Sequence, residues 1–207
     1  MFEILGYTAA IAVGLVLGII GAGGAILTVP IMVYLMGVNP VTATVYSLFI
    51  VGSTTFIGSL TYLKKGLVNL RTSLAFAIPS LISIFITRKF ILPSMPDVIY
   101  QNENFTLTKD HFVLFLFAII MLLSSFSMIF GNVEEKNIDK PMERGDYVIL
   151  FYYGIFVGFI TGLVGAGGGF LIVPALVLLA KIPVKSAIGT SLIIISANSL
   201  SGFIGDL

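Results

Sequence analysis

The sequence predicts an all-α fold: a polytopic helical membrane protein with two repeated halves, each opening with a glycine-broken helix. Composition points to the membrane, because 57% of the 207 residues are apolar and only 10% are charged, whereas a soluble domain carries about 25% charged residues. The charges also gather in short clusters, and the stretches between them reach the roughly 20 apolar residues that a helix needs to cross a bilayer core. The third observation is an internal repeat of a glycine-rich motif.

The first apolar stretch, residues 4–36, would be about 50 Å long as one helix, which is too long for one span and too short for two. Glycines in its middle, followed by Pro30, predict a helix that is broken near residues 21–24. Three ordinary spans follow at 41–63, at 72–87 with an extension over 90–92 and a kink at Pro79, and at 111–130. The polar, proline-containing segment 93–110 is predicted to be an aqueous loop.

The charge-rich segment 134–146 is predicted to be a solvated linker. It would join a first membrane repeat, 1–133, with about four spans, to a second and incomplete repeat, 147–207, with about two. The second repeat holds another long glycine-interrupted run, 147–180, and a last span, 184–204. If each run crosses once, the cytoplasmic side receives Lys64, Lys65, Arg71, Lys136, Lys140 and Arg144, and the opposite side receives Arg88, Lys89, Lys109, Lys181 and Lys185.

The repeat has an offset of 144 residues, which aligns GIIGAGGAILTVP at 18–30 with GLVGAGGGFLIVP at 162–174. Extended to Gly58 and Gly202, the alignment has 15 identities in 41 positions. Apolar composition alone would not place Gly-x-x-Gly-Ala-Gly-Gly ahead of a proline twice. Repeated halves with a glycine-interrupted helix at matching positions are typical of secondary transporters.

An unwound helix in the bilayer exposes N–H and C=O groups, so such a break persists only where it is buried in protein or lines a wet cavity. The helix that resumes after the break offers free N–H groups and a partial positive charge, which favour an anion. The alternative is that these glycines only allow close helix packing. The expected substrate-binding residues are Gly21, Ala22, Gly23, Gly24, Gly165, Ala166, Gly167, Gly168 and Gly169, with Pro30 and Pro174 as helix breaks.

Uncharged polar side chains in the spans that follow the breaks supply the remaining candidates, and Ser47, Ser191 and Asn198 are expected to support the anion. Serines often bond back to their own helix, whereas an asparagine amide is harder to satisfy there. No Asp, Glu, Lys or Arg falls deep within a predicted span, so no buried proton carrier is expected. The chain has no cysteine and a single histidine, so no metal site, cofactor or enzymatic nucleophile is expected.

The two glycine motifs carry a resemblance to a known family. Residues 162–192, GLVGAGGGFLIVPALVLLAKIPVKSAIGTSL, and their weaker sister at 18–48 resemble the TauE/SafE family of sulfite exporter-like permeases. The resemblance implies a multi-pass inner-membrane transporter of sulfite, sulfonates or related organosulfur oxyanions. Two differences stand out: Ala25 occupies the position of Gly169, and the family's helices beyond the second span of the second half are missing, as in a C-terminally truncated chain.

The predicted function is therefore a permease for small anions, with alternating access through rocking of the two halves. The alternative is a structural or assembly subunit of the membrane without its own substrate path. Expected partners are the lipid bilayer and a small anionic solute, with a homo-oligomer or additional C-terminal helices left open. The net charge of +1 argues against nucleic acid as a partner.

Overall fold

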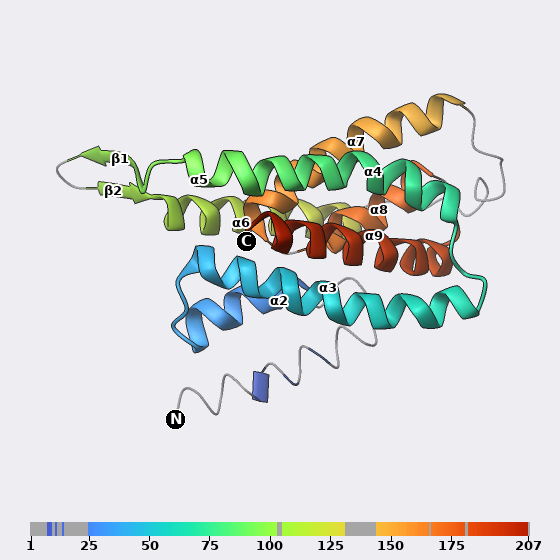
Figure 1. The fold of residues 1–207 in the computed structure, drawn as a ribbon, viewed down its shortest axis with the longest axis horizontal. Helices are drawn as coiled ribbons and strands as arrows, with labels where there is room; N and C mark the ends of the chain where they lie inside the picture. The colour runs from blue at the N-terminus through green and yellow to red at the C-terminus, as the bar shows by residue number, and fades with distance from the viewer. Residues whose placement is uncertain are drawn as a thin grey trace.

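The computed structural model describes residues 8–9, 11, 14, 25–102, 105–130, 144–165, 167–180 and 182–206. These residues form a bundle of long helices with one small β-hairpin projecting from an end (Figure 1). The all-α membrane fold expected from composition is confirmed. The elements are α2 (Ala25–Pro30), η2 (Ile31–Leu35), α3 (Pro40–Lys64), α4 (Leu70–Ile86), η3 (Thr87–Ile91), α5 (Leu92–Ser94), β1 (Val98–Asn102), β2 (Phe105–Thr108), α6 (Lys109–Phe130), α7 (Arg144–Val164), α8 (Gly169–Leu178) and α9 (Val184–Gly205).

Four helical segments are long and apolar enough to cross a membrane: Pro40–Lys64, Leu70–Ser94, Gly145–Val164 and Val184–Gly205. Three of them coincide with spans expected from hydropathy, whereas Gly145–Val164 covers only the first part of the run 147–180. Helix α6 occupies the span expected at 111–130. The helix starts are set by local chemistry, since the side chain of Asn39 accepts hydrogen bonds from the N–H groups of Val41 and Thr42 in the first turn of α3, and Pro40 is the first residue of that turn. Asn69 caps α4 in the same way.

The segment 93–110 is not the open loop that its polarity predicted. The chain stays helical to Ser94 and then forms an antiparallel hairpin in which Asn102 pairs with Phe105. The β-branched and aromatic residues of VIYQN and FTLT suit paired strands. We call the end of the bundle that carries β1 and β2 the hairpin end, and the opposite end, where residues 65–69 join α3 to α4, the loop end (Figure 1).

Helices α3 and α9 run side by side in opposite directions (Figure 1). The space beside Gly58 is filled by Leu192, and the space beside Gly202 is filled by Leu48. The 144-residue offset of the repeat relates Gly58 to Gly202 and Leu48 to Leu192, so each contact is the repeat-related copy of the other. Midway between them, Ser196 Oγ donates to Gly52 O at 3.1 Å, and these two residues are themselves related by the offset. The repeat-related helices therefore meet around a local two-fold relation with inverted direction, the arrangement of an inverted-topology repeat.

Helix α7 begins at the loop end and runs in the direction of α4. Gly154 packs on the backbone of Phe76, and Gly162 packs on Thr87 further along. After Gly165 the chain reverses, because Ile182 and the residues that follow it lie beside residues 66–71 at the loop end again. The expectation that the run 147–180 crosses once is therefore wrong: α7 and α8 form a helical hairpin that enters and leaves at the same end (Figure 1).

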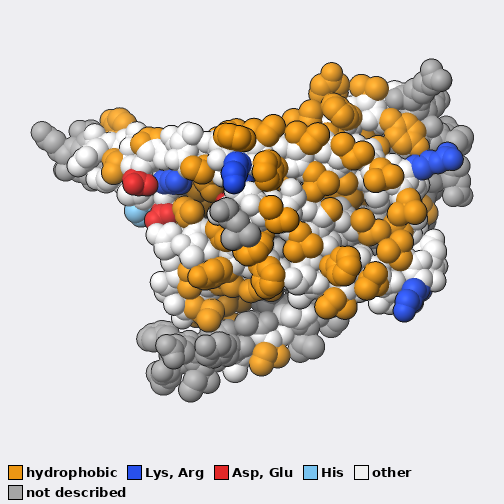
Figure 2. Space-filling model, in the orientation of Figure 1, with side chains coloured by type: hydrophobic (Ala, Val, Ile, Leu, Met, Phe, Trp, Pro, Cys, Tyr) orange, Lys and Arg blue, Asp and Glu red, His pale blue; other side chains and the backbone are white. Residues whose placement is uncertain are grey.

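The reversal moves Lys185 to the same end as Lys64, Lys65 and Arg71, and not to the opposite side as a single crossing required. Lys109 lies at the hairpin end, since its neighbour Asp110 accepts a hydrogen bond from the Asn39 side chain at 2.7 Å. Between the two ends the visible face is dominated by hydrophobic side chains, with Lys and Arg toward the ends (Figure 2). Large apolar side chains such as Phe56, Ile57 and Leu74 point outward, as lipid contact requires.

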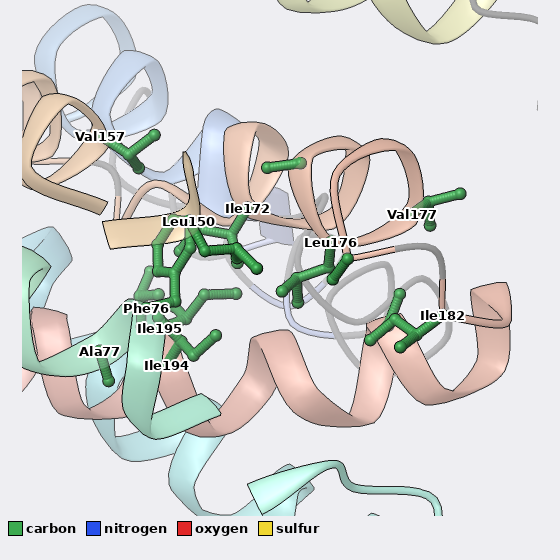
Figure 3. Close-up of a cluster of buried hydrophobic side chains, with 14 residues drawn as sticks. Phe76, Ala77, Leu150, Val157, Ile172, Leu176, Val177, Ile182, Ile194 and Ile195 are labelled. Carbon is green, nitrogen blue, oxygen red and sulfur yellow. The ribbon is translucent and has the colours of Figure 1, made fainter. Parts of the chain in front are cut away.

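The main buried cluster lies where α4, α7, α8 and α9 meet (Figure 3). Phe76 comes from α4, Leu150 from α7, Ile172 from α8, and Ile194 and Ile195 from α9, and all five are fully buried. This cluster packs the α7–α8 hairpin against α4 and α9. The glycine turn between α7 and α8 is thereby fixed inside the bundle.

Candidate functional site

The second glycine motif forms a tight turn between two helices. Helix α7 ends at Val164, α8 begins at Gly169, and Gly165, Gly167 and Gly168 have φ angles of +73°, +67° and +69°. Residues with side chains rarely adopt this left-handed backbone, so glycine is needed at these three positions. The first N–H groups of α8 point back toward the turn, since the bonding inside the helix starts with Leu171 and Ile172 donating to Gly168 O.

Each of these glycines lies against a side chain from elsewhere in the fold. A Cβ on Gly165 would clash with Thr44 of α3 and would stand 2.5 Å from Nη2 of Arg88. A Cβ on Gly167 would stand 2.8 Å from Oγ of Ser199 in α9, and one on Gly168 would clash with Oγ1 of Thr161. The glycines thus serve two purposes: they form the turn, and they let polar side chains approach its backbone.

Arg88 is the unexpected member of this site. Its side chain is 0% exposed, and Nη1 donates to Thr44 Oγ1 and to Asp206 Oδ2, each at 3.0 Å. The expectation that no charge lies deep in a span is therefore wrong for Arg88, which belongs to the continuous span Leu70–Ser94. The local helix adopts π-type bonding over Thr87–Ile91, with Arg88 buried and its neighbour Lys89 exposed.

Several buried donors around the turn have no hydrogen-bond partner within the described part of the chain. They are Nε and Nη2 of Arg88, Oγ1 of Thr161 and Oγ of Ser199, and we call these four atoms the open donors. Leaving such groups buried and unpaired costs roughly 1–3 kcal/mol each. A group of donors gathered at one turn is what a site for a negatively charged ligand provides.

The other polar residues expected at the site differ in whether their side chains have hydrogen-bond partners. Ser47 is buried, and its Oγ has no partner among the described residues, whereas Oγ of Ser191 donates back to Ile188 O at 2.8 Å. Asn198 accepts a hydrogen bond from Ser80 Oγ at 2.8 Å, which joins α9 to α4, while its Nδ2 is unpaired within the same described set.

The helix breaks are set by glycine and not by proline in the second motif. Pro174 lies inside α8, which continues to Leu178, so it does not end a helix. Pro30 lies at the junction where α2 passes into the π-helical η2, and the helix continues there as well. Gly169 is the first residue of α8. The candidates Gly21, Ala22, Gly23, Gly24 and Ala166 lie outside the described residues.

A cavity of about 430 Å³ opens at the loop end. Its lining is Gly66, Leu67, Val68, Asn69, Leu70, Arg71, Ile182, Pro183 and Ser186. Thr190 adjoins this region, because its Oγ1 accepts a hydrogen bond from the Asn69 N–H at 3.0 Å. The volume is within the usual range for small-molecule sites, about 300–1,000 Å³.

Sequence reasoning missed Arg88 and Asp206 as partners. One signal was present: Arg88 interrupts an apolar segment that resumes at Phe90, so a helix that includes this segment must carry the charge with it. The partner could not be found in this way, since Asp206 is 118 residues away and only the tertiary fold brings the two together.

Comparisons with known proteins identify a family and several relatives. The family described as sulfite exporter TauE/SafE matches residues 7–206. A probable membrane transporter protein of Xylella fastidiosa is 29% identical over 196 residues, covering 91% of this chain and 67% of that protein. A probable membrane transporter protein of Methanocaldococcus jannaschii is 29% identical over 209 residues, covering 95% of this chain and 71% of its own length.

The probable membrane transporter protein YunE of Bacillus subtilis is 29% identical over 221 residues and is covered over 77% of its length. No solved structure matches. The family match covers the α3–α9 crossing, the α7–α8 hairpin and the glycine turn together. The chain therefore belongs to the sulfite exporter TauE/SafE family of membrane transporter proteins.

Proposed function

We propose that this multi-pass membrane protein is a permease for a small oxyanion, with sulfite or a sulfonate as the substrate and the inner membrane as its location. The single observation that supports it best is the turn at Gly165, Gly167 and Gly168, which carries three left-handed glycines beside the open donors. A helix resumes directly after this turn, so backbone N–H groups and the positive end of the helix face the same region.

The inverted contact between α3 and α9 supports movement as well as binding. Repeat-related elements that meet around a two-fold relation can exchange their environments when one half rocks against the other, which exposes the same site to either side in turn. The cavity at the loop end, with Arg71 in its lining, would admit an anion from that side. Ser47, Ser191 and Asn198 remain the proposed supporting polar groups.

The test is anion uptake into proteoliposomes that contain the purified full chain, with sulfite, sulfonates, sulfate and chloride compared. The variant Gly167→Ala places a methyl group 2.8 Å from Ser199 Oγ at a left-handed position, and it is expected to reduce uptake of the sulfur oxyanion at least tenfold. Its matched control is Gly37→Ala, which has the same φ of +67° but nothing within 4 Å of the added Cβ and lies outside the cavity lining. Equal uptake by the two variants would contradict the site.

A structural subunit without a substrate path is the second candidate, and a specific observation supports it. Gly154, Gly158 and Gly162 recur every four residues on α7. The first two let that helix lie directly on the α4 backbone, and the third packs on the Thr87 side chain. If packing were the whole purpose of the motif, folded Gly167→Ala protein and wild type would conduct equally little of every anion tested.

A further inference from the structure

The strongest unexplained feature of the bundle is the half-paired guanidinium of Arg88. Its Nη1 is bound to Thr44 and Asp206, whereas its Nε and Nη2 have no partner among the described residues. A buried ion pair is a weak source of stability, because desolvation of both charges offsets most of their attraction. A purely structural role for Arg88 would therefore leave its two remaining donors unexplained.

The unpaired nitrogens form one geometric unit. In the planar guanidinium, Nε and Nη2 share the edge that offers two parallel N–H groups, the fork that binds two oxygens of one oxyanion. Nη2 stands 2.5 Å from the position of a Cβ on Gly165, so this edge borders the glycine turn. Asp206 holds the other side of the guanidinium through Nη1 and thereby fixes its orientation.

The neutral open donors border the same turn. Ser199 Oγ is beside Gly167 and Thr161 Oγ1 is beside Gly168, and consecutive Cα atoms are only about 3.8 Å apart. These donors come from three different elements: Arg88 from η3, Ser199 from α9 and Thr161 from α7. An ion bound between them would therefore contact all three elements. All three side chains are buried, as the desolvated partner of a small anion must be.

The charges at the site limit the kind of anion. Arg88 contributes one positive charge and Asp206 opposes it at 3.0 Å, so the pair is formally neutral before an anion enters. A singly charged anion leaves a net charge of one on the site, whereas a doubly charged one such as sulfate leaves two in a poorly solvated interior. The balance favours a monoanion with at least three oxygens: two for the guanidinium fork and one for a hydroxyl.

We propose that the Nε–Nη2 edge of Arg88 is the charged half of the substrate site and that it binds a singly charged sulfonate-type oxyanion, with Ser199 and Thr161 completing the contacts. The inference rests on the proposed function and deepens it by naming the cationic residue and the charge of the substrate. Asp206 is a positioning residue in this arrangement.

The first experiment measures binding without transport. The thermal unfolding midpoint of the detergent-purified full chain is recorded with methanesulfonate, sulfate and chloride at equal ionic strength. Methanesulfonate is expected to raise the midpoint of the wild type and of the control Lys89→Gln, which removes the neighbouring exposed cation. Equal stabilisation by sulfate would overturn the assignment of a monoanion.

The variants decide the role of Arg88. Removing the arginine alone would leave Asp206 half-buried without its partner, so Arg88→Gln is combined with Asp206→Asn, which removes both charges. This double variant is expected to fold, to lose the stabilisation by methanesulfonate and to lose at least 100-fold in uptake. Retained stabilisation and uptake would overturn the proposal.

Arg88→Lys covers the case in which the double variant does not fold. It keeps the charge but not the fork, and its KM for methanesulfonate uptake is expected to rise about tenfold, whereas an unchanged KM would overturn the proposal. The proposed function fails separately: folded wild type that moves no oxyanion contradicts transport, while oxyanion uptake by wild type and by Arg88 variants alike contradicts only the role of Arg88.

Discussion

At the scale of single residues, the two halves of the repeat have diverged in how they use equivalent hydroxyls. Thr55 and Ser199 are related by the 144-residue offset, and both are buried. Thr55 Oγ1 donates to Val51 O of its own helix at 2.6 Å, which satisfies it locally. Ser199 Oγ is one of the open donors beside Gly167. The same position is therefore structural in one half and available to a ligand in the other.

This difference predicts opposite outcomes for two similar substitutions. Ser199→Ala is expected to lower kcat/KM for oxyanion uptake about 10- to 100-fold, because a hydrogen bond to a charged ligand contributes roughly 1.5–3 kcal/mol. Thr55→Val, which keeps the side-chain shape and removes a locally satisfied hydroxyl, is expected to leave uptake unchanged. Initial uptake rates over a range of sulfonate concentrations measure both. A loss of uptake in Thr55→Val as large as in Ser199→Ala would contradict the assignment.

The roles of some single residues at the site could be predicted from the sequence, and those of others could not. A helix break at the second glycine motif was predictable, because the same Gly-Ala-Gly-Gly run occurs inside an apolar stretch in both halves. The buried Arg88 was not, since a charge next to a hydrophobic segment normally marks the membrane surface. Its burial depends on Asp206 and Thr44, which are distant in sequence and reach it only through the packing of α3 and α9.

At the scale of elements, α7 carries glycines of two kinds. Those of the turn follow Val164, whereas Gly154, Gly158 and Gly162 lie within the helix and bring it onto α4. At Gly158 an added Cβ would clash with the carbonyl oxygen of Ser80 and would stand 2.9 Å from its Cα. Because backbone cannot move aside as a flexible side chain can, the two helices would have to separate.

Gly158→Ala is therefore expected to destabilise the protein by about 1–3 kcal/mol, the usual cost of overpacking. Gly145→Ala is the control on the same helix, because nothing lies within 4 Å of its added Cβ and alanine favours a helix. Thermal unfolding in detergent should show a lower midpoint for Gly158→Ala and an unchanged or slightly higher one for Gly145→Ala. Equal midpoints would mean that α7 does not rely on close contact with α4.

Hydropathy predicted most of the described helices but could not predict how they turn. The spans α3, α4 and α9 begin and end close to where their apolar stretches do, since lipid dictates both length and composition. The hairpin of β1 and β2 was missed because its short strands lie outside the spans, where polarity alone suggests a loop. The reversal between α7 and α8 was missed because the hydropathy of an apolar run with a break is the same whether the chain crosses the membrane or returns to the side from which it entered.

At the scale of the whole molecule, the reversal changes the topology and with it the distribution of charge. Lys64, Lys65, Arg71 and Lys185 now share the loop end, where α7 also begins at Arg144, while Lys89 and Lys109 lie toward the hairpin end. This distribution is more one-sided than the one that a single crossing gave. By the positive-inside rule, the loop end is expected to face the cytoplasm.

The chain contains no cysteine, so single cysteines can report this topology without background. Lys64→Cys and Lys185→Cys replace exposed residues, and both are expected to react with a membrane-impermeant maleimide from the same side of the membrane. Tyr100→Cys, in the exposed hairpin, is expected to react only from the other side. Labelling of intact cells and of inverted vesicles separates the sides. If Lys185→Cys were labelled together with Tyr100→Cys, the α7–α8 segment would cross the membrane once. The turn at Gly165 would then be a break within one span, and the site at Arg88 would lose the returning helix whose N-terminus faces it.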